Sequence, residues 1–139
     1  MRLHPMFGAL LLATACGGGT LYTAVTATPA SGPADVTSCA RAKLKQLGYQ
    51  QTSFDETDNR LTARRVDNSI NRADPMYRRN EDRIEIETGA AADGKTSLKV
   101  VAHTFAEYET HRGPTEVEER ASQNVTQASQ AVIQSCGQG

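Results

Sequence analysis

The sequence predicts an α+β fold, a two-layer sandwich with two helices on one face of an antiparallel sheet. Apolar residues recur at helical spacing in two outer segments, and they alternate with polar residues in four segments between them. Such alternation is typical of an antiparallel sheet with one buried face. The predicted order is helix, four-stranded meander, helix, in a single domain over residues 35–137.

The first predicted helix begins near Asp35 or Thr37, since either side chain can cap it. Its buried stripe consists of four apolar residues at helical spacing, namely Val36, Ala40, Leu44 and Leu47. Gly48 offers a cap at the other end, where the sequence turns into the sheet.

Four strands are predicted next, joined by turn-forming residues. They span residues 49–55, 60–66, 83–88 and 96–108, and a long polar loop covers 67–80. In the last strand Leu98, Val100 and Ala102 share one face, whereas Val101 and Phe105 share the other. We expect segment 20–26 to cover Val101 and Phe105, although an open face used for partner binding is the alternative.

The second helix is predicted to open at Pro114, because proline suits the first turn and several glutamates follow it. Its narrow apolar stripe contains small residues that permit close packing on the sheet: Val117, Ala121, Val125, Ala128 and Val132. Reversals along the meander should make the two helices antiparallel, so that the start of one lies beside the end of the other.

The first sixteen residues carry the clearest targeting signal. A basic residue, Arg2, precedes a short apolar run, and Ala13-Thr14-Ala15 leads directly to Cys16. This arrangement resembles the lipobox of bacterial lipoproteins. The resemblance implies cleavage of residues 1–15 and attachment of acyl chains such as palmitate at Cys16. The same residues also fit an ordinary secretory signal, whereas the apolar run is too short for a transmembrane helix.

A tether is predicted between the lipid and the domain, over residues 16–34. Within it, residues 20–26 are rich in strand-forming side chains and are either an extra edge strand or a spacer. The resemblance places the protein in the cell envelope, held to a membrane by its lipid. Since Gly17 is not the aspartate associated with retention in the inner membrane, it implies the outer membrane, facing the periplasm, in a diderm organism.

Once Cys16 is assigned to lipid, the remaining cysteines form an even pair. In an oxidising envelope Cys39 and Cys136 are expected to be disulfide-bonded. Cys39 is near the start of the first helix and Cys136 near the end of the second, so the antiparallel arrangement brings them together. The pattern of apolar residues and the cysteine count therefore support the same topology.

Charge and motifs argue against several functions. The mature chain has a net charge of about −2, which is unlike the basic footprint of a nucleic-acid binder. No nucleophile motif or phosphate-binding glycine loop occurs, so we expect no enzymatic activity and no cofactor. The mature histidines, His103 and His111, lack neighbours with metal-ligand spacing, and we expect no metal site.

The arginines between residues 60 and 83 are the remaining candidates for a site. Guanidinium groups suit carboxylates and phosphates, and Arg72, Arg78 and Arg79 lie in the predicted loop. Nearby acidic residues are almost as numerous, which favours a solvated, neutralised surface. We therefore expect a non-catalytic binding or scaffold module with an envelope protein partner. The alternative is a binder of anionic small molecules, glycans or lipid headgroups through residues 60–83.

Overall fold

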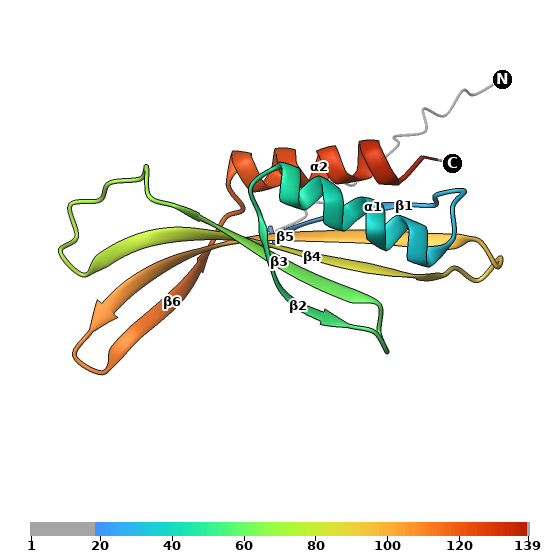
Figure 1. The fold of residues 1–139 in the computed structure, drawn as a ribbon. Helices are drawn as coiled ribbons and strands as arrows, with labels where there is room; N and C mark the ends of the chain where they lie inside the picture. Colours follow the sequence, from blue (N-terminus) through green and yellow to red (C-terminus); the bar gives the residue numbers. More distant parts are fainter. Residues whose placement is uncertain (1–18, 139) are drawn as a thin grey trace, which may run out of the picture.

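A computed structural model describes residues 19–138, which form one antiparallel sheet with two helices packed on it (Figure 1). The elements in chain order are β1 (Thr23–Ala27), α1 (Pro33–Gln46), β2 (Gln50–Asp55), β3 (Arg60–Asp67), β4 (Tyr77–Ala90), β5 (Thr96–Thr110), β6 (Gly113–Glu119) and α2 (Gln123–Cys136). The predicted α+β class is confirmed. The predicted signal peptide and Cys16 lie outside the described residues.

The sheet has six strands instead of the four predicted. Its order is β1-β5-β4-β3-β2, and β6 also pairs with β5. Because β4 pairs with nearly the whole of β5, both β1 and β6 must lie along the other edge of β5. β1 pairs with residues 98–102 of that strand and β6 with residues 104–110, so the two short strands follow one another along one edge.

Both helices cover the same face of the sheet and run in opposite directions (Figure 1). The strands send alternate side chains to this face, where Ile84, Ile86 and Val100 are fully buried. Val36, Ala40 and Leu44 of α1 meet Val125, Ala128 and Val132 of α2 in the same core. The alternation of Leu98, Val100 and Ala102 is therefore confirmed as the buried face of β5.

The prediction that the second helix begins at Pro114 is wrong. Residues 113–119 form strand β6, which turns back from β5 through a tight hairpin at His111 and Arg112. Gly113 has φ +103 in this turn, a backbone conformation that strongly favours glycine. Val117 consequently belongs to β6 and is 50% exposed, whereas it was assigned to the buried stripe of the helix.

Other boundaries also differ from the predictions. α1 begins at Pro33, whose fixed φ suits the first helical position, and its N-cap is Gly32 instead of Asp35 or Thr37. β4 starts at Tyr77, which shortens the loop between β3 and β4 to residues 68–76. Segment 20–26 is an edge strand over Thr23–Ala27. It extends the sheet sideways and does not cover Val101 or Phe105.

The predicted disulfide between Cys39 and Cys136 is present and joins α1 to α2, with the two Cα atoms 5.7 Å apart. The amide of Ala30 also donates a hydrogen bond to the carbonyl of Gln138. Gly137 allows this close approach, since a Cβ there would meet Ile133 O at 2.6 Å and Ala27 Cβ at 2.7 Å. The segment between β1 and α1 is thus fastened to the C-terminal end of α2.

None of the helices in residues 19–138 is long and apolar enough to cross a bilayer.

Candidate interaction surface on the open face of the sheet

The face of the sheet opposite the helices has no second layer over it in the described part of the chain (Figure 1). The strand registers place the side chains of this face in rows. β4 contributes acidic residues and arginines, β5 contributes aromatic and apolar residues, and β3 and β6 contribute charged residues that pair with those of β4. We call this surface the open face. Its residues come from five strands, so only the folded sheet assembles them.

A buried glutamate lies at the centre of the open face. Glu81 of β4 is 3% exposed although no helix covers it, because two arginine side chains lie against its carboxylate. Arg83 Nε donates to it at 2.6 Å and Arg64 Nη1 at 3.3 Å. Arg83 also donates to Glu116 of β6, which joins β3, β4 and β6 in one network of charges.

Aromatic rings extend this network along β5. The guanidinium of Arg83 lies 4.3 Å from the centroid of the Phe105 ring, in cation–π contact. Phe105 stacks on His103 with the two ring centroids 5.9 Å apart, and the centroids of the His103 and Tyr22 rings are 5.4 Å apart. His103 Nδ1 is 2.7 Å from Glu118 Oε1 of β6. His103 is thus a half-buried member of this aromatic row.

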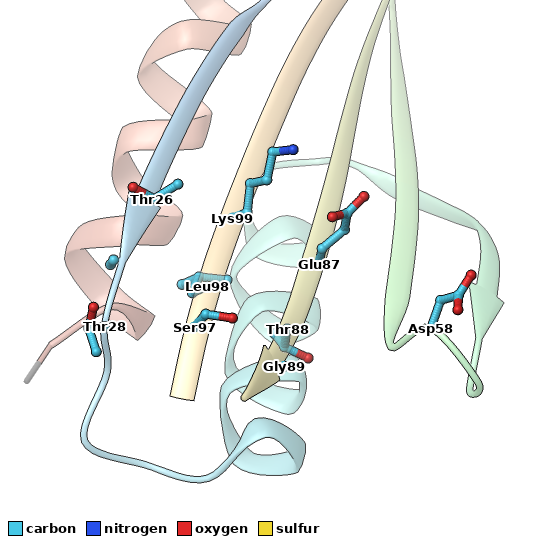
Figure 2. A pocket seen from close by; sticks show the side chains of 10 residues that line it. Thr26, Thr28, Asp58, Glu87, Thr88, Gly89, Ser97, Leu98 and Lys99 are labelled. Carbon is cyan, nitrogen blue, oxygen red and sulfur yellow. The ribbon is translucent and has the colours of Figure 1, made fainter. Parts of the chain in front are cut away.

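A groove of about 450 Å³ lies at the other end of the open face (Figure 2). Gly89 of β4 pairs with Ser97 of β5 at the bottom of the groove. Because glycine has no side chain, it leaves space there. Lys99 and Glu87 stand on neighbouring strands above it, and Thr26 and Thr28 border it on the β1 side. Glu87 is already paired with Arg60 at 3.0 Å, whereas Lys99 and Asp58, the other charged residues of the lining, have no ion-pair partner among the described residues.

The structure does not bring Arg72, Arg78 and Arg79 together as an anion site. Arg79 lies on the open face and pairs with Glu107 at 3.1 Å. Arg78 donates to the main-chain carbonyls of Pro75 and Tyr77. Most arginines between residues 60 and 83 are matched by a carboxylate of this chain.

Arg72 reaches back from the loop over the helix side of the sheet. It donates two hydrogen bonds to Glu119 at 2.5 and 2.6 Å and a third to the hydroxyl of Tyr108 at 3.0 Å. Its guanidinium also lies 4.7 Å from the centroid of the Tyr77 ring. The hydrogen bonds from Arg72 lower the pKa of Glu119. Arg72 therefore anchors the loop and is not available to a ligand in this conformation.

A second buried carboxylate, Asp82, connects the sheet to α2. Its carboxylate is 2% exposed and accepts hydrogen bonds from Thr104 Oγ1 and Ser122 Oγ. Those hydroxyls in turn accept from two main-chain amides at the start of α2, those of Ser122 and Val125. Burial raises the pKa of Asp82 in spite of these hydrogen bonds. Asp82 thus caps α2 through two hydroxyl groups and has a structural role.

Sequence reasoning missed the glutamates that complete the open face. Glu116 and Glu118 were assigned to the first turn of a helix, where acids are favourable, although they alternate with Val117 as strand residues do. The alternation of Glu116, Val117 and Glu118 and the turn-forming Gly113 before them were the sequence signals that could have predicted a strand here. Among residues 19–138, no three His, Cys, Asp or Glu side chains are grouped to hold a metal ion.

The sequence matches no known protein family, and no curated protein is significantly similar to it.

Proposed function

We propose that this chain is a lipid-anchored cell-envelope protein that acts as a non-catalytic binding module for another envelope protein. The observation that carries the proposal is the open face. It has no layer over it in the described residues, yet its charged side chains are held by ion pairs and cation–π contacts. The predicted lipid at Cys16 would keep this face close to a membrane.

The charges of the open face suit a protein partner better than a polyanion. Arg60, Arg64, Arg79 and Arg83 each pair with a glutamate, so a phosphate would have to displace carboxylates that are already bound. Arginine and aromatic residues are enriched in the cores of protein interfaces. A protein surface that carries both signs can match this pattern without breaking it.

The fixed arrangement of these side chains also favours binding. Association costs free energy for every side chain that it immobilises, about 0.5 to 1.5 kcal/mol for a long flexible one. Arg83 is already held by Glu81, Glu116 and Phe105 before any partner arrives. His103 and Glu118 are likewise held by each other, with His103 Nδ1 2.7 Å from Glu118 Oε1.

Site-specific photocrosslinking in intact cells tests this proposal. A photoreactive residue is placed at Lys99 or Thr62, both on the open face, and at Gln130 on the helix layer as the matched control. We expect one discrete protein adduct from both open-face positions and none from Gln130. The adduct should weaken when Arg83→Glu is added. Absence of an adduct at both positions, or the same adduct at Gln130, would refute the proposal.

Anion binding through residues 60–83 is the alternative, and Arg78 is the observation in its favour because its partners are main-chain carbonyls. A thermal-shift titration with inorganic polyphosphate separates the two functions. A ligand that binds the folded state raises the unfolding midpoint. A rise that disappears in Arg78→Ala and persists in the matched control Arg112→Ala would favour the alternative, whereas no rise in the unmodified protein favours protein recognition.

A further inference from the structure

The large hydrophobic side chains that remain exposed in the described residues are gathered at one edge of the sheet. They are Leu21 and Tyr22, each 41% exposed, and Val117, 50% exposed. Leu21 and Tyr22 immediately precede β1, and Val117 lies in β6. Both strands follow the same edge of β5, so the three side chains belong to one margin of the molecule.

A main-chain hydrogen bond fixes the two segments of this margin to each other. The amide of Ala121, just after β6, donates to the carbonyl of Leu21 at 2.8 Å. Tyr22 is also held by its contact with His103 of β5. The apolar side chains are thus presented by ordered backbone, which we call the β1–β6 margin and define by residues 21–27 and 113–121.

The charges of the margin do not oppose a membrane surface. Two of the three glutamates beside Val117 are ion-paired with arginines of the chain, Glu116 with Arg83 and Glu119 with Arg72, and Glu118 Oε1 lies 2.7 Å from His103 Nδ1. Arg120 on this segment and Arg112 in the turn just before it are exposed, and neither has an ion-pair partner among the described residues. Anionic headgroups attract exposed arginines of this kind.

The chain length before the margin limits how far it can lie from the anchor. Leu21 follows Cys16 by five residues, and a fully extended chain spans at most about 3.5 Å per residue. Leu21 can therefore lie no more than about 18 Å from an acylated Cys16. The headgroup layer on each side of a bilayer is roughly 6 Å thick. A lipid at Cys16 consequently keeps the Leu21 end of this margin close to the membrane.

We infer that the β1–β6 margin rests on the membrane surface that holds the lipid anchor, with Leu21, Tyr22 and Val117 in the headgroup layer. This inference rests on the proposed lipid anchor. Tyrosine suits this layer because its ring is apolar and its hydroxyl is polar. The sheet then stands on its edge, and the open face looks sideways along the membrane, where a membrane-bound protein can reach it.

Tryptophan fluorescence tests this orientation, because the sequence contains no tryptophan. Single variants Tyr22→Trp and Val117→Trp report from the margin, and Gln130→Trp on α2 is the matched control. Each full-length lipidated protein is reconstituted in phosphatidylglycerol–phosphatidylcholine vesicles with or without brominated acyl chains. We expect brominated lipid to remove most of the emission of both margin variants and to leave that of Gln130→Trp unchanged.

Flotation of the same vesicles separates the two possible failures. If the unmodified protein does not float with vesicles, the lipid anchor is wrong and the orientation falls with it. If it floats but brominated lipid quenches Tyr22→Trp and Val117→Trp no more than Gln130→Trp, the anchor stands and the orientation is overturned. A far-UV circular dichroism spectrum equal to that of the unmodified protein shows that the tryptophan has not unfolded the domain.

Discussion

Arg72 and Arg78 are six positions apart in one arginine-rich segment, yet their surroundings differ. The Arg72 side chain is 29% exposed and is held by Glu119, Tyr108 and the Tyr77 ring. Arg78 is exposed and donates to main-chain carbonyls of its own turn. Arg78 is therefore solvated, as expected, but is not neutralised by a carboxylate, whereas Arg72 fastens the 68–76 loop to the sheet.

Arg72→Ala should lower the free energy of unfolding by about 1 to 3 kcal/mol, because it breaks charged hydrogen bonds in a half-buried place. Arg78→Ala, the matched control, should change it by less than about 0.5 kcal/mol. Since Arg72 lowers the pKa of Glu119, the difference between wild type and Arg72→Ala should be lost as the pH falls through that lowered pKa. Urea unfolding at several pH values measures both effects. Equal effects of the two substitutions would contradict this account of the loop.

Asp82 is the residue whose ionisation should oppose folding. Burial raises its pKa above the usual value of 3.8, so the folded state binds the proton more tightly than the unfolded state does. Its contribution to stability is thus greatest below pH 3.8 and declines as the pH rises through the raised pKa. The hydrogen bonds from Thr104 and Ser122 act in the opposite direction but are outweighed.

Asp82→Asn removes this titration and should change the pH dependence of stability. The free energy of unfolding of the wild type, minus that of Asp82→Asn, should fall as the pH rises from about 4. The control Asp58→Asn changes an exposed aspartate in the turn after β2 and should change the free energy of unfolding by less than about 0.5 kcal/mol. If the difference in the free energy of unfolding between wild type and Asp82→Asn instead rises with pH, the hydrogen bonds from Thr104 and Ser122 lower the pKa of Asp82 more than burial raises it.

At the scale of elements, the chain was predictable where one short-range pattern dominated. Val36, Ala40 and Leu44 follow helical spacing, and Leu98, Val100 and Ala102 alternate, and all six are buried as expected. Segment 113–119 offered two conflicting patterns. Pro114 and its glutamates suit a helix start, but the strand is favoured by its pairing with β5 and by ion pairs to Arg83 and His103. Those partners are distant in sequence, so propensity could not reveal them.

The open face was less predictable for the same reason. Its alternating residues in β5 were assigned to one face correctly, but the partners that bury Glu81 come from β3 and from another position in β4. Strand register decides which acid meets which arginine, and register depends on the whole sheet. The sequence therefore indicated a charged, arginine-rich segment without indicating that its arginines are paired.

The helix layer depends on the disulfide between α1 and α2. Cys39 and Cys136 are 97 residues apart, so their bond strongly restricts the unfolded chain. Cys39→Ser should lower the free energy of unfolding by roughly 2 to 5 kcal/mol, as for native bridges in small secreted domains. Reductant should lower the unfolding midpoint of the wild type and leave that of Cys39→Ser unchanged. Two thiols that alkylate freely in unreduced native protein would show that the bond is absent in solution.

For the whole molecule, the positions of the chain ends and of the exposed surfaces are connected. The disulfide and the Ala30–Gln138 hydrogen bond tie the segment that follows β1 to the C-terminal end of α2, beside the helices. The residues just before β1 lie near the start of α2, where Leu21 accepts a hydrogen bond from Ala121 and Tyr22 contacts the aromatic row. An anchor upstream of β1 therefore acts on the edge of the sheet, leaving the open face and the helix layer on either side.

This arrangement gives the anchor a direct test. Cys16→Ala should release the protein from membranes or leave it uncleaved, because the thiol that the lipid requires is missing. Fractionation of cell membranes followed by intact-mass measurement distinguishes the two results, since an uncleaved chain retains residues 1–15. The matched control Cys39→Ser replaces a cysteine elsewhere, one that is disulfide-bonded, and should remain membrane-bound with residues 1–15 removed. Normal mature mass and unchanged membrane fractionation of Cys16→Ala would refute the anchor, and the membrane-edge orientation with it, while the pairing of charges on the open face would stand.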